Sequence, residues 1–478
     1  MLRDAFVGGP GASGVSFMGR SGARLHTLFG EGWDIVSWDP RGVGDSEPDV
    51  SPFSTYAEYH AFWEQLLGTG KVDSCGNLTR PDDIAFFHSQ TSAITDFIQQ
   101  YDAKNRENSG DNLKYIGTCV VIRDLVGMVD AIYGRGADVN FYGVSYGTLI
   151  GAYPTQMFPR RVGKVIVDGV LDAVTWAKTL ITAGLSTDVL GREAALQAWC
   201  SACAGSMNCT IGAIGNHTTE GVMAVVDRIL NQAYLDYDGT KLTFADLLRN
   251  GTLPIYSHAW SFNVLTSFLA NLLNGIPSWR VLDRSLAGIY AMQHNGATIL
   301  NARAELSSLD PILKPRFAPW NIPTPWAGWA DESTSFNQAG LPIACGDSQR
   351  PPPGYTTLKL FNEIIQVSKT VSPHFGTLLI PRWACHEWRP KSVVLVIGNN
   401  VDPITPWVSA QALASRKRLG HMARLVKFNT VGHTSRSTTS SNCVNGIINA
   451  YIRGVIPEDK GDDGPDVMCE MDAQPFPP

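Results

Sequence analysis

The chain has 478 residues, of which 44% are hydrophobic and 17% are charged, and its formal net charge is −6. Such a chain can bury a large core, either as two or three units of ~150 residues or as one α/β domain with a long insertion. The acidic balance and the lack of a basic block argue against a nucleic-acid partner, and no apolar run approaches the ~18 residues that a membrane-spanning helix needs.

The first part of the chain alternates apolar strands with helical patterns. Strands are predicted at residues 2–7, 33–38, 139–143 and 164–168. A helix is predicted at 111–135, where apolar residues recur at helical spacing, and a second, apolar helix follows Ser145 up to Pro159. Strands that alternate with helices indicate a parallel sheet covered on both faces, so the predicted fold class is α/β.

The middle of the chain has a different pattern. Helices are predicted there at 192–204, 222–233 and 259–273, with a proline-rich break at 350–354. Sheet patterns return after Lys391, with strands in SVVLVIGNNVDP and at 423–429 and helices at 407–419 and 443–453. We therefore expect an α/β core at 1–175 and 389–478, interrupted at 176–388 by a mostly helical cap of ordinary domain size.

The segment Gly143-Val144-Ser145-Tyr146-Gly147 has the pattern G-x-S-x-G between a predicted strand and a predicted helix. A sharp turn at this place strains the serine backbone and lifts the hydroxyl above the sheet, and glycine tolerates the close approach of neighbouring chain. A chance match is the alternative, because the chain has 46 glycines. The position between strand and helix favours Ser145 as a nucleophile.

A serine nucleophile needs a base, and the base needs an acid to orient it. Of the ten histidines, His433 lies in a loop after the last predicted strand, and Asp402 follows the strand before it. This order, Ser, Asp, His, is that of α/β-hydrolases. Asp168, after strand 164–168, is the second candidate acid. His386 and His421 are expected on the surface or in the cap.

An oxyanion hole needs two backbone donors near the serine. We expect the Tyr146 N–H to be one of them, since Tyr146 follows Ser145. The glycine-rich loop after the first strand would supply the other, from Gly9 or otherwise from Gly8 or Gly11. A plain tight turn is the alternative for this loop.

The nine cysteines are scattered, and only Cys200, Cys203 and Cys209 cluster. A zinc site would need a fourth ligand, so no metal is expected, and nothing indicates a cofactor. Spread cysteines and four N-x-S/T sequons, at Asn77, Asn208, Asn216 and Asn250, indicate an oxidising, glycosylating compartment. The N-terminus as written has no signal-peptide pattern, which would instead indicate the cytoplasm.

Several motifs together resemble the proline-iminopeptidase and tripeptidyl-aminopeptidase-like group of α/β-hydrolases. They are GGPGASG, WDPRGVGDSEP, GVSYGTLIGAYPTQMFPRRVGKVIVDGVLD, VIGNNVDPITPWVSA and VGHTSR, with YIGTCVVIRDLVGMVDAIYG similar to fungal members. The resemblance implies Ser145 as nucleophile, Asp402 as acid and His433 as base, in a sheet with a helical cap.

The resemblance also implies disulfides and an exported protein. The implied pairs are Cys75–Cys119, Cys345–Cys385 and Cys443–Cys469, with Cys209 bonded to Cys200 or Cys203. Relatives carry a leader and two further strands before the glycine loop. The chain is therefore expected to be an N-terminally shortened form, with the strand at 33–38 left as a sheet edge.

The expected function is hydrolysis through an acyl-enzyme on Ser145, most simply by an exopeptidase that releases short peptides or single residues from the amino end of small substrates. Glu305, Asp331 and Glu332 could then bind the substrate's α-ammonium group. The alternatives are an esterase, lactonase or amide hydrolase of fungal secondary metabolism, and a non-catalytic binding protein on a degenerate scaffold.

Overall fold

The computed structural model of the protein describes most of the chain. The described residues are 2–6, 9–30, 32–55, 57–58, 61–62, 78–178, 185–236, 265–266, 269–270, 272–273, 275–295, 339–347, 355–376, 394–415, 419, 423–436 and 441–472. Within them, no helix is both long and apolar enough to span a membrane.

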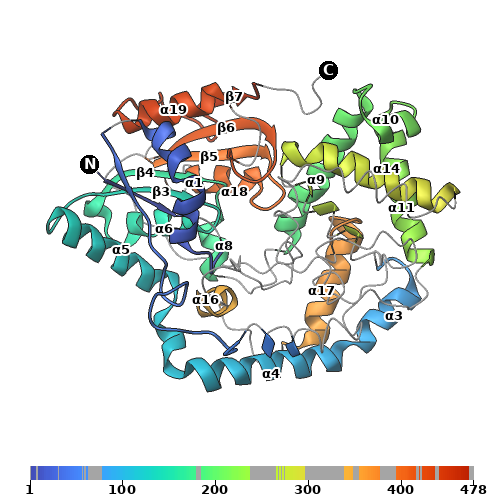
Figure 1. The fold of residues 1–478 in the computed structure, drawn as a ribbon, viewed down its shortest axis with the longest axis horizontal. Helices are drawn as coiled ribbons and strands as arrows, with labels where there is room; N and C mark the ends of the chain where they lie inside the picture. The colour runs from blue at the N-terminus through green and yellow to red at the C-terminus, as the bar shows by residue number, and fades with distance from the viewer. Residues whose placement is uncertain are drawn as a thin grey trace.

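A seven-stranded sheet forms one side of the molecule, at the left of Figure 1. Its strands are β1 (Leu2–Phe6), β2 (Asp34–Val36), β3 (Val139–Val144), β4 (Val162–Asp168), β5 (Val394–Val401), β6 (Ala423–Val431) and β7 (Val467–Glu470). The order is β2-β1-β3-β4-β5-β6-β7, and every described pairing is parallel. The α/β class is therefore confirmed, and β2 stands at one end of the sheet.

Two layers of helices cover the sheet, because alternate strand residues point to opposite faces. Phe141 and Val165 face one core, with α5 (Thr118–Tyr133), α6 (Gly147–Ala152) and α18 (Trp407–Ala414). Tyr142 and Ile166 face the other core, with α1 (Gly14–Phe29) and α19 (Asn442–Ile452). These strands and helices are called the sheet region below.

The described residues between β4 and β5 are largely helical. The helices that pack around the buried Trp199 and Trp279 are α9 (Leu185–Ala204), α10 (Thr210–Ile214), α11 (Thr219–Asp236) and α14 (Trp279–Asn295). They form the helical region, at the right of Figure 1. Gly275 from this region forms an antiparallel bridge with Gly432, which precedes His433.

The remaining helices connect or flank these two regions. They are α3 (Pro81–Ser89), α4 (Thr91–Ser109), α7 (Pro154–Met157), α8 (Ala173–Lys178), α16 (Gly340–Asp347) and α17 (Thr357–Thr370), with 3-10 turns at Gly110–Tyr115, Pro159–Arg161 and Ile276–Ser278. Helix α4 runs along the bottom of Figure 1, below both regions. The rings of Phe87 in α3 and Phe361 in α17 stack with centroids 4.1 Å apart.

Most predicted elements are found, with shifted ends. The helix predicted at 111–135 begins only at Thr118, after a 3-10 turn, and the one predicted at 407–419 ends at Ala414. The apolar helix expected to run from Ser145 to Pro159 is broken into α6 and α7, since Pro154 cannot donate a backbone hydrogen bond. Strand β7 was not predicted. The helix predicted at 259–273 lies mostly outside the described residues.

Two disulfides lie within the described part of the chain, Cys443–Cys469 and Cys203–Cys209, and the second decides between Cys203 and Cys200 as the partner of Cys209. Cys75, Cys385 and the side chain of Cys345 lie outside the described residues, so the other two pairings stay predictions. Of the sequons, Asn208 and Asn216 are exposed, while Asn77 and Asn250 lie outside the described residues. Glycosylation stays a prediction.

Candidate active site

Ser145 lies in a tight turn directly after β3. Its φ of 54° is in the left-handed region, which non-glycine residues rarely adopt. A Cβ on Gly143 would lie 2.1 Å from the carbonyl oxygen of Gly147, so both flanking glycines lie in close-packed backbone. The Thr148 hydroxyl donates to the Ser145 carbonyl at 2.5 Å, which closes the turn. The strained strand-to-helix geometry expected of G-x-S-x-G is therefore present.

Asp402 and His433 are in direct contact. His433 Nδ1 lies 3.0 and 3.1 Å from the two carboxylate oxygens of Asp402. The Asp402 side chain is fully buried, whereas that of His433 is 13% exposed. The carboxylate is thus shielded from solvent, whereas the imidazole remains partly accessible to solvent.

The Asp402 carboxylate accepts several further hydrogen bonds. Ile404 N donates to it at 2.9 Å, and Thr405 donates from both its N–H and its hydroxyl at 2.7 Å. Burial would raise the pKa of Asp402, but the charge on His433 and the hydrogen bonds from His433 and Thr405 outweigh burial and hold the pKa below its ordinary value. The carboxyl is therefore ionised at neutral pH and able to orient the imidazole.

The three predicted residues follow the carboxyl ends of parallel strands, so they share one edge of the sheet. Ser145 N donates to the carbonyl of Asp168, the last residue of β4, at 3.0 Å. A Cβ on the next residue, Gly169, would lie 3.3 Å from His433 Cε1. Ser145 and His433 therefore flank the same two residues. Among the hydrogen bonds of these described residues, none joins the Ser145 hydroxyl to His433.

Asp168, the second candidate acid, does not bond to His433. Its carboxylate accepts from the N–H of Ser435 at 3.1 Å and from the Ser435 hydroxyl at 2.6 Å, and Tyr142 Oη donates to it at 3.3 Å. Burial raises the pKa of Asp168, and the hydrogen bonds from Ser435 oppose this shift. Of the two carboxylates, only that of Asp402 is hydrogen-bonded to His433 among the described residues.

The expected oxyanion residues follow two neighbouring strands, Gly9 after β1 and Tyr146 after β3. Tyr146 is fully buried, and its hydroxyl lies 2.7 Å from the Thr118 hydroxyl. Gly9 has a φ of 134°, which requires glycine, while Gly8 lies outside the described residues. In the loop that follows Gly9, the Ser13 hydroxyl donates to Asp39 at 2.6 Å, which holds the loop in place. An oxyanion role for Tyr146 and Gly9 stays a prediction.

Two polar residues around the acid and base were not singled out from the sequence. Thr405 contacts both Asp402 and, at 3.2 Å, His433 Nδ1. Asn399 lies buried near the end of β5 and bonds to the loop that carries His433. Thr405 could have been found, because a threonine three residues after an aspartate commonly bonds back to it in a turn. For Asn399 no sequence signal exists.

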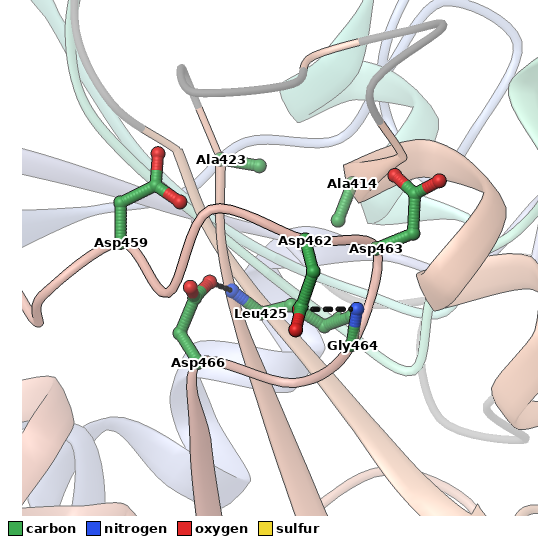
Figure 2. Close-up of a pocket in the computed structure, with 8 residues that line it drawn as sticks. All are labelled: Ala414, Ala423, Leu425, Asp459, Asp462, Asp463, Gly464 and Asp466. Atoms are coloured by element: carbon green, nitrogen blue, oxygen red, sulfur yellow. Dashed lines mark hydrogen bonds between the residues drawn. The ribbon is translucent and has the colours of Figure 1, made fainter.

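An acidic hollow elsewhere on the sheet is not part of this site. Figure 2 shows Asp459, Asp462 and Asp466 around it, with Asp466 accepting from Leu425 N at 2.7 Å. Leu425 lies at the amino end of β6, whereas His433 follows the carboxyl end of the same strand. The hollow and the Asp402–His433 pair therefore lie at opposite ends of the strand.

Residues 381–463 match the family model described as TAP-like protein. That segment includes both Asp402 and His433.

Relatives extend the similarity to most of the chain. Serine protease Hip1 of Mycobacterium tuberculosis (strain ATCC 25618 / H37Rv) is 24% identical over 470 residues, covering 94% of this chain and 77% of the relative. Carboxylesterase B of M. tuberculosis (strain CDC 1551 / Oshkosh) matches with the same identity and coverage. Tripeptidyl aminopeptidase of Streptomyces coelicolor is 30% identical over 201 residues, 41% of this chain and 33% of the relative. The chain is therefore similar over most of its length to proteins named as hydrolases, and over residues 381–463 to the TAP-like family model.

Proposed function

We propose that the protein is a serine hydrolase that transfers an acyl group from its substrate to Ser145 and then to water. The observation that carries this proposal is the contact between buried Asp402 and His433 at the sheet edge where the strained Ser145 turn lies. A hydrogen bond from an acid fixes the tautomer of a catalytic imidazole and stabilises its protonated form.

In the proposed reaction, His433 Nε2 takes the proton of the Ser145 hydroxyl while Oγ attacks the substrate carbonyl carbon. The N–H groups of Tyr146 and Gly9 donate to the oxyanion that forms. His433 then gives its proton to the leaving group, and a water molecule releases the acyl group by the same route. Because Nδ1 faces Asp402, Nε2 is the nitrogen left for this transfer.

One motion is required before transfer can occur, since the Ser145 hydroxyl and His433 are not hydrogen-bonded in the structure. Catalytic hydrogen bonds are often long in ligand-free enzymes and shorten in the substrate complex. A rotation of the Ser145 or His433 side chain would suffice, because both residues flank Asp168 and Gly169.

A fluorophosphonate probe tests the proposal directly, because it reacts with activated serines irrespective of the natural substrate. We expect the wild-type protein to be labelled and Ser145→Ala not to be. Ser409→Ala is a matched control, since Ser409 is a buried serine in α18 outside the site. Equal labelling of wild type and Ser145→Ala would refute the proposal, and no labelling of a folded wild type would favour the non-catalytic alternative.

For the substrate we propose short peptides cleaved from the amino end, following the relatives named serine protease and tripeptidyl aminopeptidase. The residues expected to bind the α-ammonium group, Glu305, Asp331 and Glu332, lie outside the described residues. The relative named carboxylesterase B supports a second candidate, hydrolysis of esters. Turnover of alanyl- and prolyl-anilides, compared with that of short acyl esters, separates the two candidates. A measurable kcat/KM on the esters and none on either anilide would exclude the peptidase.

A further inference from the structure

The loop that carries His433 has an unusual backbone on both sides of that residue. Gly432 has a φ of 134° and Thr434 a φ of 63°. The left-handed region strongly disfavours a β-branched residue such as threonine. Such conformations persist only where the surrounding structure holds them, and they concentrate at functional sites. The residues that hold this loop are therefore of interest.

Asn399 in β5 contacts the loop on both sides of His433. Its Nδ2 donates to the carbonyl of Gly432 at 2.7 Å and to that of Thr434 at 2.8 Å. Asn399 is only 1% exposed, so water does not compete for these bonds. One buried amide group thus fixes the two carbonyl groups that flank the proposed base.

Asp168 at the end of β4 contacts the same loop from the neighbouring strand. Its carboxylate accepts both the N–H and the hydroxyl of Ser435, two residues after His433. Its backbone carbonyl accepts the N–H of Ser145 at 3.0 Å. Asp168 therefore connects the nucleophile's turn to the base's loop through its own backbone and side chain.

The other polar groups of the loop are bonded as well. Gly432 N donates to Val401 O at 2.9 Å, and Thr434 N donates to Asp402 at 3.2 Å. A Cβ on Gly169 would lie 2.6 Å from a methyl carbon of Thr434, so the loop packs closely on the end of β4 at a position where a side chain would collide with it. The ends of β4 and β5 therefore determine where His433 lies.

We propose that Asn399 and Asp168 are positioning residues, which fix the backbone of His433 so that a side-chain rotation brings its imidazole within reach of Ser145. This inference rests on the proposed serine hydrolase function. Neither side chain is placed to touch the substrate, and each acts through the backbone of residues 432–435.

The test compares two substitutions of similar volume with a matched control. Asn399→Leu removes both amide donors, and Asp168→Asn replaces one of the two carboxylate oxygens by an NH2 group, so that only one acceptor remains for the N–H and the hydroxyl of Ser435. With p-nitrophenyl acetate as substrate, we expect kcat to fall on the order of 10- to 100-fold, with KM within about twofold, because a misplacement of about 1 Å can lower turnover about 100-fold. Thr430→Val is the control, since Thr430 is equally buried in β6 and its hydroxyl has no hydrogen-bond partner. Its kcat should stay within about twofold of wild type.

A second pair of variants covers the case in which one of these proteins does not fold. Ser435→Ala removes the 2.6 Å bond to Asp168, and Ser435→Thr keeps a hydroxyl at that position. We expect Ser435→Ala to lose kcat and Ser435→Thr to restore it. Equal kcat in this pair would overturn the role of Asp168, and kcat of Asn399→Leu equal to that of Thr430→Val would overturn the role of Asn399.

Ser145→Ala distinguishes a failure of the positioning role from a failure of the proposed function. If Ser145→Ala is inactive while the Asn399 and Asp168 variants turn over normally, the positioning role is wrong and the hydrolase function stands. If Ser145→Ala turns over substrate as fast as wild type, the proposed hydrolase function is wrong. The positioning role, which rests on that function, is then wrong as well.

Discussion

The sheet region and the helical region use buried polar groups for different ends. In the sheet region, Asp402 and Asp168 lie at the ends of strands and accept hydrogen bonds from the loop that carries His433, whose backbone is strained at Thr434. In the helical region, His374 lies between Glu193 in α9 and Asp227 in α11 and bonds to both, at 2.8 Å for Asp227. In the proposed function the first arrangement positions a loop for chemistry, whereas the second links α9 and α11 to the residues that follow α17. Buried charge by itself therefore does not identify an active site.

The largest expected effect is on the acid of the sheet region. Asp402→Asn should keep the hydrogen-bonded geometry but fix the wrong imidazole tautomer, which lowers kcat by about 10⁴-fold in serine hydrolases of this type. Steady-state hydrolysis of an acyl ester by the purified variant measures this loss of kcat. Were Asp168→Asn to lose this much rate and Asp402→Asn little, the two carboxylates would have to exchange roles.

The two disulfides should stabilise their regions unequally. Cys443–Cys469 closes a chain segment with a sequence separation of 26, whereas Cys203–Cys209 in the helical region has a separation of 6. Loop-closure entropy gives about 3.5 kcal/mol for the first and about 2.2 kcal/mol for the second. Denaturant unfolding of the two double-serine variants measures the difference. A larger loss for the Cys203/Cys209 variant would show that strain or packing, not loop entropy, dominates.

The ion cluster of the helical region predicts a pH dependence of stability. Burial lowers the pKa of His374, but the bonds to Asp227 and Glu193 outweigh it and raise the pKa to about 9 from an ordinary 6.5. A raised folded-state pKa stabilises the protein fully below about pH 6.5, and this stabilisation is lost as the pH rises through about 9. It is worth on the order of 2–3 kcal/mol. His374→Gln should therefore remove this contribution, so that the melting temperature falls less between pH 6.5 and 9 than it does in wild type.

The partly exposed His88 provides the control for this cluster. Its ring bonds only to the Asn362 amide, at 3.0 Å, so His88→Gln should leave the pH dependence of the melting temperature unchanged. The same slope in wild type and in His374→Gln would mean that His374 is not charged in the folded protein.

The smallest expected effect lies where the two regions meet. A Cβ on Gly191 in α9 would lie 2.1 Å from the carbonyl oxygen of Asp402, and Arg192 Nε donates to Pro403 O at 3.2 Å. Gly191→Ala should therefore destabilise the protein by about 1–3 kcal/mol through overpacking and should also lower kcat. Gly288→Ala in α14, where a Cβ meets nothing within 4 Å, should be neutral or stabilising. Equal effects of the two substitutions would contradict a close contact between α9 and the acid's loop.

What could be predicted from the sequence follows from local physical signals. The Ser145 turn was predicted because glycines and a strand-to-helix junction are local, and Asp402 and His433 because both follow buried strands. Strand β7 was missed because its four residues carry no alternating pattern, and it is held by pairing with β6 and by the Cys443–Cys469 bond.

Contacts between distant segments could not be predicted in this way. Asn399 reaches carbonyl groups more than thirty positions away, and Glu193 meets His374 across 181 positions. Neither residue differs in its local sequence from an ordinary strand or helix residue. Long-range polar contacts of this kind become visible only once the fold brings their partners together.

The central claim is that Ser145, His433 and Asp402 act as one proton relay. A crystal structure of the protein phosphonylated at Ser145 tests it most directly, since the adduct mimics the tetrahedral intermediate. We predict His433 Nε2 within about 3.2 Å of the serine oxygen, with the Nδ1–Asp402 contact retained. An imidazole turned away from the adduct, or a phosphonate attached to a different residue, would contradict the account.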